Sequence, residues 1–89
     1  MAYFVYILQS LTDGTYNVGS THNVNSRLER HNQGRSQYTQ SKRPWQLVHF
    51  EEFSTKFDAL KRENQIKRRK IKRFIQSLIK TSEHVNAAN

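Results

Sequence analysis

Tyr3-Phe4-Val5-Tyr6-Ile7-Leu8 is a run of aromatic and branched apolar residues, and it predicts a β-strand over residues 2–9. A turn signal, Thr12-Asp13-Gly14, follows it, so residues 15–20 predict the returning strand of a hairpin. The run is far shorter than the roughly 20 apolar residues that cross a bilayer, so it predicts neither a membrane helix nor a signal segment.

The remaining pattern predicts one more strand and three helices. Asn23 is a plausible N-cap, and Gly34 is placed to end the first helix. The tail from Thr81 to Asn89 has no periodicity, so we expect it to be disordered beyond a single domain over residues 1–80. The predicted elements of this α+β chain are a helix from Asn23 to Asn32, a polar loop from Arg35 to Pro44, a strand from Trp45 to Phe53, and helices over Lys56–Arg69 and Ile71–Lys80.

The composition of the chain points to a polyanionic partner. Fifteen Lys and Arg face seven carboxylates among 89 residues, which gives a net charge of +8. Between Lys61 and Arg73 every charged residue except Glu63 is a cation, and like charges at helical spacing repel one another. Nucleic acid explains this run better than a solvated helix face does, and better than an anionic membrane, because the helix lacks a broad apolar face. The absence of cysteine excludes disulfides and thiolate metal sites and fits a cytoplasmic protein.

Two polar residues share the apolar stripe of the first predicted helix. Val24, Arg27, Leu28 and His31 fall at positions i, i+3, i+4 and i+7, so they face the sheet together. A guanidinium in such a place needs an anionic partner or ligand. The alternative is an arginine whose stem packs while its charge reaches water at the sheet edge.

Glu63 repeats this arrangement on the later helix, since Ala59, Leu60 and Ile66 flank it on the apolar side. It could form a salt bridge with Arg27, or it could hold a hard cation such as Mg2+, which needs only one or two carboxylates. No second carboxylate lies on a matching stripe, so the sequence favours a site for one metal ion over a site for two.

Together these segments resemble the GIY-YIG nuclease superfamily, and most closely its small single-domain bacterial members, over residues 2 to 80. Val5-Tyr6 corresponds to the Ile-Tyr of the first family motif, and Asn17-Val18-Gly19 to the Tyr-Ile-Gly of the second. The other matching segments are Ser26–Asn32, with the family's arginine and its frequent histidine, Tyr38-Thr39, Arg43-Pro44-Trp45, and Ala59–Lys67, with the metal-binding glutamate.

The resemblance implies a three-stranded antiparallel sheet flanked by three helices and hydrolysis of a DNA phosphodiester with one Mg2+ or Mn2+ ion on Glu63. Arg27 would neutralise the phosphoryl group, and Tyr6 would position or help deprotonate the attacking water. His31 has the unperturbed pKa that suits a general base near neutral pH. We expect a monomer whose contacts with nucleic acid come from Lys42, Arg43, Lys67, Arg68, Arg69 and Lys70.

Asn17 departs from the family pattern, which places a tyrosine there. An amide can orient a water molecule but cannot accept its proton at useful pH, and Tyr16 points to the opposite face of the strand. The chain is therefore a variant that relies on His31, a degenerate nuclease that only binds nucleic acid, or a form inactivated by substitution. A structural or protein-interaction domain, with Arg27 and Glu63 as a buried pair, is the remaining interpretation.

Overall fold

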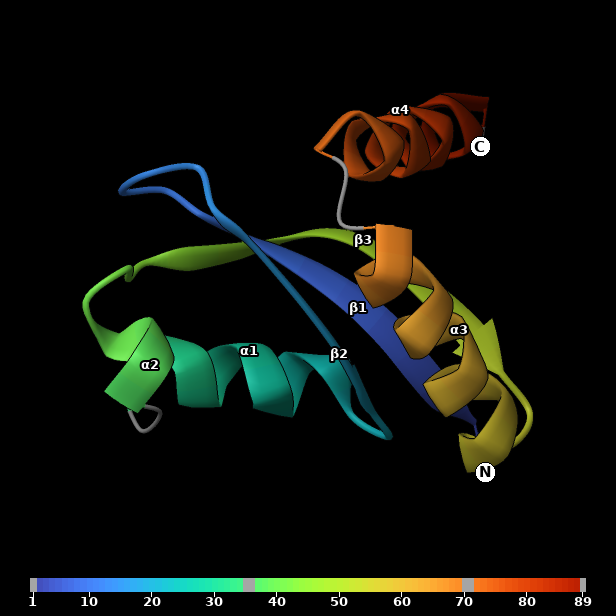
Figure 1. Ribbon diagram of the computed structural model, residues 1–89, viewed down its shortest axis with the longest axis horizontal. Helices are drawn as coiled ribbons and strands as arrows, with labels where there is room; N and C mark the ends of the chain where they lie inside the picture. The colour runs from blue at the N-terminus through green and yellow to red at the C-terminus, as the bar shows by residue number, and fades with distance from the viewer. Residues whose placement is uncertain (1, 35–36, 70–71, 89) are drawn as a thin grey trace.

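The computed structural model describes residues 2–34, 37–69 and 72–88. Its three strands form one antiparallel sheet in the order β2-β1-β3, which confirms the predicted sheet (Figure 1). The strands are β1 (Tyr3–Ser10), β2 (Tyr16–Thr21) and β3 (Trp45–Phe53). The strand that comes first in the chain thus lies in the middle of the sheet.

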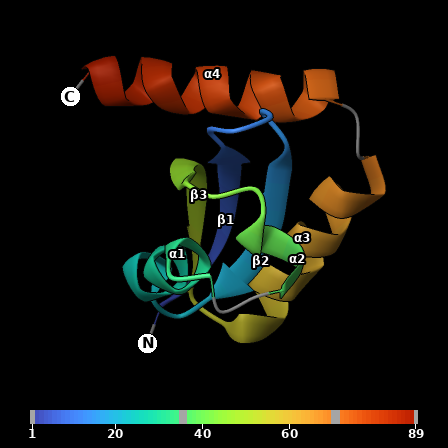
Figure 2. The ribbon, with the colours of Figure 1, turned by 90° about the vertical axis from the view of Figure 1, so that its left-hand side faces the viewer.

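Four helices pack around this sheet: α1 (Val24–Asn32), α2 (Gln37–Gln40), α3 (Lys56–Arg69) and α4 (Lys72–Ala88). Figure 1 shows α1 on one side of the sheet and α3 and α4 on the other. Figure 2 shows α4 lying across the end of the sheet at which β1 and β2 are joined. None of the helices in the described ranges is long and apolar enough to cross a membrane.

Local chemistry explains where these elements begin and turn. The side chain of Asn23 accepts a hydrogen bond from the Ser26 backbone N–H at 3.0 Å, so it caps α1 as predicted. Thr55 caps α3 in the same way through the backbone N–H of Asp58, at 3.1 Å. Gly14 has φ of 78° in the β1–β2 turn, a conformation that favours glycine.

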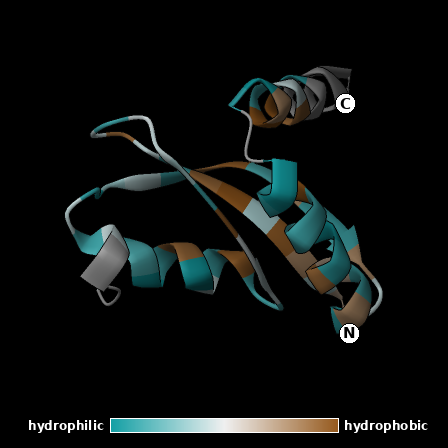
Figure 3. Ribbon diagram, in the orientation of Figure 1, coloured by the Kyte–Doolittle hydropathy of each residue, from teal (hydrophilic) through white to brown (hydrophobic). Residues whose placement is uncertain are grey.

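The strand β1 is buried on both faces, which explains its continuous apolar sequence. Val5 and Ile7 pack with Ala59 and Ile66 of α3 and with Ile75 of α4. The opposite face carries a second apolar cluster, formed by Tyr6, Leu8 and Trp45 with Val24, Leu28 and Leu47 packed against it. Figure 3 shows hydrophobic residues along β1 and mostly hydrophilic ones along α3. The two clusters fix α1 and α3 on opposite faces of the same strand.

The structure differs from the sequence-based expectation at three places. The predicted loop before β3 contains the short helix α2, a single turn that is too brief to show periodicity. Helix α4 continues to Ala88 instead of ending at Lys80; alanines favour helix, and each added residue adds one backbone hydrogen bond. A shift in register between Ile7 and Leu8 adds one residue to β3 and interrupts its alternation. The predicted helix start at Ile71 lies outside the described residues.

Candidate active site

The hairpin places Tyr6 directly opposite Gly19, and the phenol ring lies over the glycine. Tyr6 is only 3% exposed. A Cβ at Gly19 would collide with the Tyr6 hydroxyl and would lie 2.6 Å from Cζ of the same ring. Glycine at this position therefore gives the phenol room to extend across β2 towards the edge of the sheet.

Charged groups from two helices act on that phenol. Burial raises the pKa of Tyr6, while the charge of the Arg27 guanidinium and a hydrogen bond from it lower the pKa. The negative charge of Glu63 raises the pKa of Tyr6 further, and Arg30 has a small opposite effect. Tyr6 of β1, Arg27 of α1 and Glu63 of α3 thus lie close enough to interact, although they come from three separate elements.

His31 joins this group from the last turn of α1. Its ring centroid lies 6.5 Å from that of Tyr6 and 6.1 Å from that of Trp45. The Nδ1 atom of His31 lies 3.0 Å from Oγ1 of Thr39, which fixes the orientation of the ring. Burial lowers the pKa of His31, and the charges of Arg27 and Arg30 lower it further. The imidazole is therefore neutral near pH 7 and able to accept a proton.

A set of hydrogen bonds that the sequence did not predict joins Asn32, the neighbour of His31 in the chain, to Trp45, and Trp45 to Thr39. The Asn32 side chain accepts from the Trp45 backbone N–H at 2.6 Å and donates to the Trp45 carbonyl at 3.0 Å. The Trp45 indole N–H donates to the Thr39 carbonyl at 3.0 Å. One signal was available: a buried indole N–H needs an acceptor, but the sequence does not say which one.

Glu63 lies at the edge of the group, with its side chain 13% exposed. Its carboxylate forms an ion pair with Lys67, one turn further along α3, with Oε2 2.6 Å from Nζ. This pair replaces the salt bridge with Arg27 that was one interpretation of the sequence.

Residues 2–75 match the family described as the GIY-YIG catalytic domain. The chain belongs to this family. Over 67 residues it is 45% identical to UPF0213 proteins of Staphylococcus aureus strains N315 and MW2, an alignment that covers 74% of this chain and 80% of each relative. The solution NMR structure of a UPF0213 protein from Bacillus halodurans has a similar fold, with a TM-score of 0.57 and 30% identity over 91% of this chain and 85% of that one. The name UPF0213 states no activity.

Divalent metal is the cofactor that GIY-YIG nucleases generally use, and the local residues fit one ion. No group of three or more His, Cys, Asp or Glu side chains gathers in the part of the chain that the structure describes. A single carboxylate with water and substrate phosphate suffices for Mg2+. Glu63 is partly open to solvent and could serve as that carboxylate once Lys67 exchanges its partner.

Asn17 occupies the position of the second GIY-YIG tyrosine. It pairs with Leu8, on the same sheet face as Gly19 and Tyr6, while Tyr16 packs with the cluster on the opposite face. Tyr16 therefore does not replace the missing phenol, as the alternation of the strand predicted.

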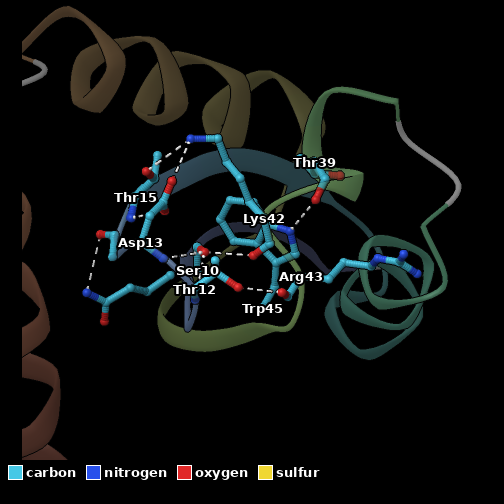
Figure 4. A network of polar contacts seen from close by, with 10 residues as sticks. Ser10, Thr12, Asp13, Thr15, Thr39, Lys42, Arg43 and Trp45 are labelled. Atoms are coloured by element: carbon cyan, nitrogen blue, oxygen red, sulfur yellow. Dashed lines mark hydrogen bonds and ion pairs between the residues drawn. The ribbon is translucent and has the colours of Figure 1, made fainter.

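The cations predicted to contact nucleic acid fall into two groups. Lys42 donates to Asp13 at 2.9 Å and to Thr15 at 3.3 Å, and the hydrogen bonding from Lys42 lowers the pKa of Asp13 (Figure 4). Arg43 donates through Nε to the Gln40 carbonyl at 2.9 Å. Both residues therefore help to fold the loop before β3, which Ser10 and Thr12 also anchor through hydrogen bonds to its carbonyls (Figure 4).

The second group of cations lies on α3. Arg68 and Arg69 are exposed, and the Arg69 guanidinium lies 4.7 Å from the centre of the Phe74 ring. Lys67 is half-exposed beside Glu63, and Lys70 lies outside the described residues. Among the predicted cations that the structure describes, Lys42 and Arg43 thus help to hold the loop before β3, whereas Arg68 and Arg69 are exposed on α3.

A polar cluster on the opposite sheet face is separate from this site. Glu51 accepts from Arg62 Nε at 2.8 Å and lies 2.8 Å from His49 Nε2. Hydrogen bonding from His49, followed by the hydrogen bond and charge of Arg62, lowers the pKa of Glu51 to about 2 despite its burial. The cluster ties α3 to β3 and thereby helps to hold Glu63 in place.

Proposed function

We propose that this protein hydrolyses phosphodiester bonds in DNA with the help of one divalent metal ion. The observation that carries the proposal is the convergence of Tyr6, Arg27, His31 and Glu63, delivered by β1, α1 and α3. A guanidinium can neutralise a phosphoryl group, a proton acceptor and a phenol can activate or orient a water molecule, and a carboxylate can hold a metal ion.

Each side chain has a role that follows from its place. Glu63 would hold one Mg2+ or Mn2+ ion, which supplies charge neutralisation and a more acidic water molecule. Arg27 would bind the non-bridging phosphate oxygens. This interaction would become stronger as negative charge develops on those oxygens in the transition state. Tyr6 would orient the attacking water through its hydroxyl.

His31 is the group that takes the proton in this proposal. Its Nδ1 atom lies 3.0 Å from Thr39 Oγ1. In the tautomer that donates Nδ1–H to Thr39, Nε2 is the nitrogen that receives the proton from water. The lowered pKa of His31 keeps that nitrogen unprotonated near neutral pH. Asn17 would orient the water through its amide, and the missing phenol would not be needed.

Cleavage of single-stranded, duplex and branched DNA with Mg2+ or Mn2+ tests the proposal. We expect Glu63→Ala to lower the rate at least about 100-fold, as loss of one electrostatic contribution typically does. Glu52→Ala, which removes an exposed carboxylate on β3, is the matched control and should leave the rate unchanged. Equal rates for Glu63→Ala and the parent chain would contradict the metal assignment.

A second candidate is a module that binds nucleic acid without cutting it. Asn17 and the exposed Arg68 and Arg69 favour it. It predicts that neither the parent chain nor Asn17→Tyr cuts under any metal, while both bind with steep salt dependence. Joint replacement of Lys67, Arg68, Arg69 and Lys70 should then flatten that dependence.

A further inference from the structure

A second arginine, Arg30, lies one turn beyond Arg27 on α1. Both positions fall inside the regular helix Val24–Asn32, where residues three apart lie on neighbouring positions of one side, with Cβ atoms about 5–6 Å apart. Arg27 is partly buried, whereas Arg30 is exposed. The two guanidiniums therefore form a pair that leads from the candidate site towards solvent.

The charge of Arg30 reaches two groups of the candidate site. It lowers the pKa of the Tyr6 phenol and that of the His31 imidazole, as the charge of Arg27 also does. Tyr6 belongs to β1 and His31 to the last turn of α1, and their ring centroids lie 6.5 Å apart. A guanidinium that is close to both rings lies along the side of α1 that borders Tyr6. Arg30 therefore lies at the solvent-exposed border of the candidate site.

No anion of the described residues neutralises Arg30, since its side chain forms neither an ion pair nor a hydrogen bond among them. The adjacent carboxylate, Glu29, instead accepts a hydrogen bond from Gln33 Nε2 at 3.5 Å. Like charges three residues apart on a helix repel one another, so the pair of arginines favours a bound anion. A cation in the last turn also interacts favourably with the helix dipole, but that effect does not require Arg30 to border Tyr6.

We propose that Arg30 binds the phosphate next to the one that is cut, so that the protein recognises two adjacent phosphates of one strand. Arg27 has the partly buried position beside Tyr6, which suits the reacting phosphate, and Arg30 has the exposed position, which suits its neighbour. The planar fork of a guanidinium can donate two hydrogen bonds to the non-bridging oxygens of a phosphate. The smallest good substrate is then a segment with two successive charged phosphates. This inference rests on the proposed function for the assignment of Arg27 to the phosphate that is cut.

Two oligonucleotides of the same sequence test this recognition. Their backbones are neutral methylphosphonate, except at a single phosphodiester in the first and at two adjacent phosphodiesters in the second. With Mg2+ we expect the parent chain to cut the second with a kcat/KM about ten-fold higher, because a hydrogen bond to a charged group is gained. This exceeds the doubling that a second cleavable bond gives by itself. Arg30→Ala should reduce the preference to that doubling, whereas Arg73→Ala, which removes an exposed arginine from α4, is the matched control and should keep it.

A second measurement checks where the guanidinium lies without any substrate. Titration of the imidazole by NMR should show that Arg30→Ala raises the pKa of His31 and that Arg73→Ala does not. Arg30→Lys keeps the positive charge, so it should leave the pKa of His31 in place, yet it lacks the planar fork and should lose much of the preference for two phosphates. An arginine that only stabilises the end of α1 would change the Tm and neither of these properties.

Three results would overturn the inference: no preference of the parent chain beyond the doubling, an unaltered preference in Arg30→Ala, or equal losses in Arg30→Ala and Arg73→Ala. Binding of the same two oligonucleotides without metal, followed by fluorescence anisotropy, separates the inference from the proposed function. A binding preference that depends on Arg30 in a chain that never cuts would leave the two-phosphate site standing and refute the proposed function. Cleavage without the preference would do the reverse.

Discussion

Replacement of Gly19 by alanine tests the geometry on which the candidate site depends. The added Cβ would lie 2.6 Å from Cζ and 3.1 Å from Cε2 of Tyr6, where ordinary contacts begin near 3.4 Å. The ring must therefore move by roughly 1 Å, and it has little room, because Tyr6 is 3% exposed. Overpacking of this kind costs about 1–3 kcal/mol, which corresponds to a fall in Tm of about 5–20 °C for a domain of this size.

The same displacement of the Tyr6 ring should also lower the cleavage rate. A shift of about 1 Å in a reacting group can lower the rate about 100-fold, so we expect Gly19→Ala to lose cleavage as well as stability. Thermal unfolding by circular dichroism and the DNA cleavage assay measure the two effects. A double-mutant cycle with Tyr6→Leu isolates the contact, because the alanine should cost little once the ring is gone. Equal destabilisation by Gly19→Ala in both backgrounds, or no change in Tm, would refute the reasoning.

Two further predictions concern groups that the site depends on indirectly. The pKa of Glu51 falls from an ordinary 4.5 to about 2 on folding, so its contribution to stability is present above pH 4.5 and is lost as the pH falls towards 2. Glu51→Gln should therefore lower the free energy of unfolding by at most about 3 kcal/mol at pH 7 and by almost nothing at pH 2. Urea unfolding at both pH values measures this difference, and an equal loss at the two pH values would contradict the prediction. Thr39→Val should leave His31 Nδ1 without its partner, lower the free energy of unfolding by about 1–3 kcal/mol and mix the ring tautomers, as seen by 15N NMR of the imidazole. Thr39→Ser should keep both the stability and the single ring tautomer. Identical spectra for the valine and serine variants would show that Thr39 does not orient His31.

The order of elements was predictable because the local signals agree with one another. The run from Tyr3 to Leu8 mixes aromatic and branched residues, and Asn23 and Thr55 are strong capping residues beside clear helical stripes. The bounds of β3 and α3 were predicted correctly. The one-turn helix α2 was not, because four residues are too few to show a period.

The side chains of the candidate site were predictable from the sequence, but the residues that orient them were not. Arg27, His31 and Glu63 stand out since each interrupts an apolar stripe, a signal contained in the spacing alone. The partners that orient them depend on tertiary contacts: Thr39 lies in a stretch that the sequence predicts as a polar loop, and Lys67 resembles the other cations of its run. The partner of Lys42 was also hidden, because Asp13 is far from it in sequence and lies beside it only after β3 pairs with β1.

The central place of β1 in the sheet has a consequence for synthesis on the ribosome. Residues 3–10 are made before β2 and β3 and can pair with β2 soon after it follows, but their other edge belongs to β3, which begins only at Trp45. During that interval an apolar strand with unpaired backbone groups is open to other chains. The nascent protein is therefore most prone to aggregation while residues 3–21 are outside the ribosome and residues 45–53 are still inside it, and a pause in that interval should expose the segment most readily.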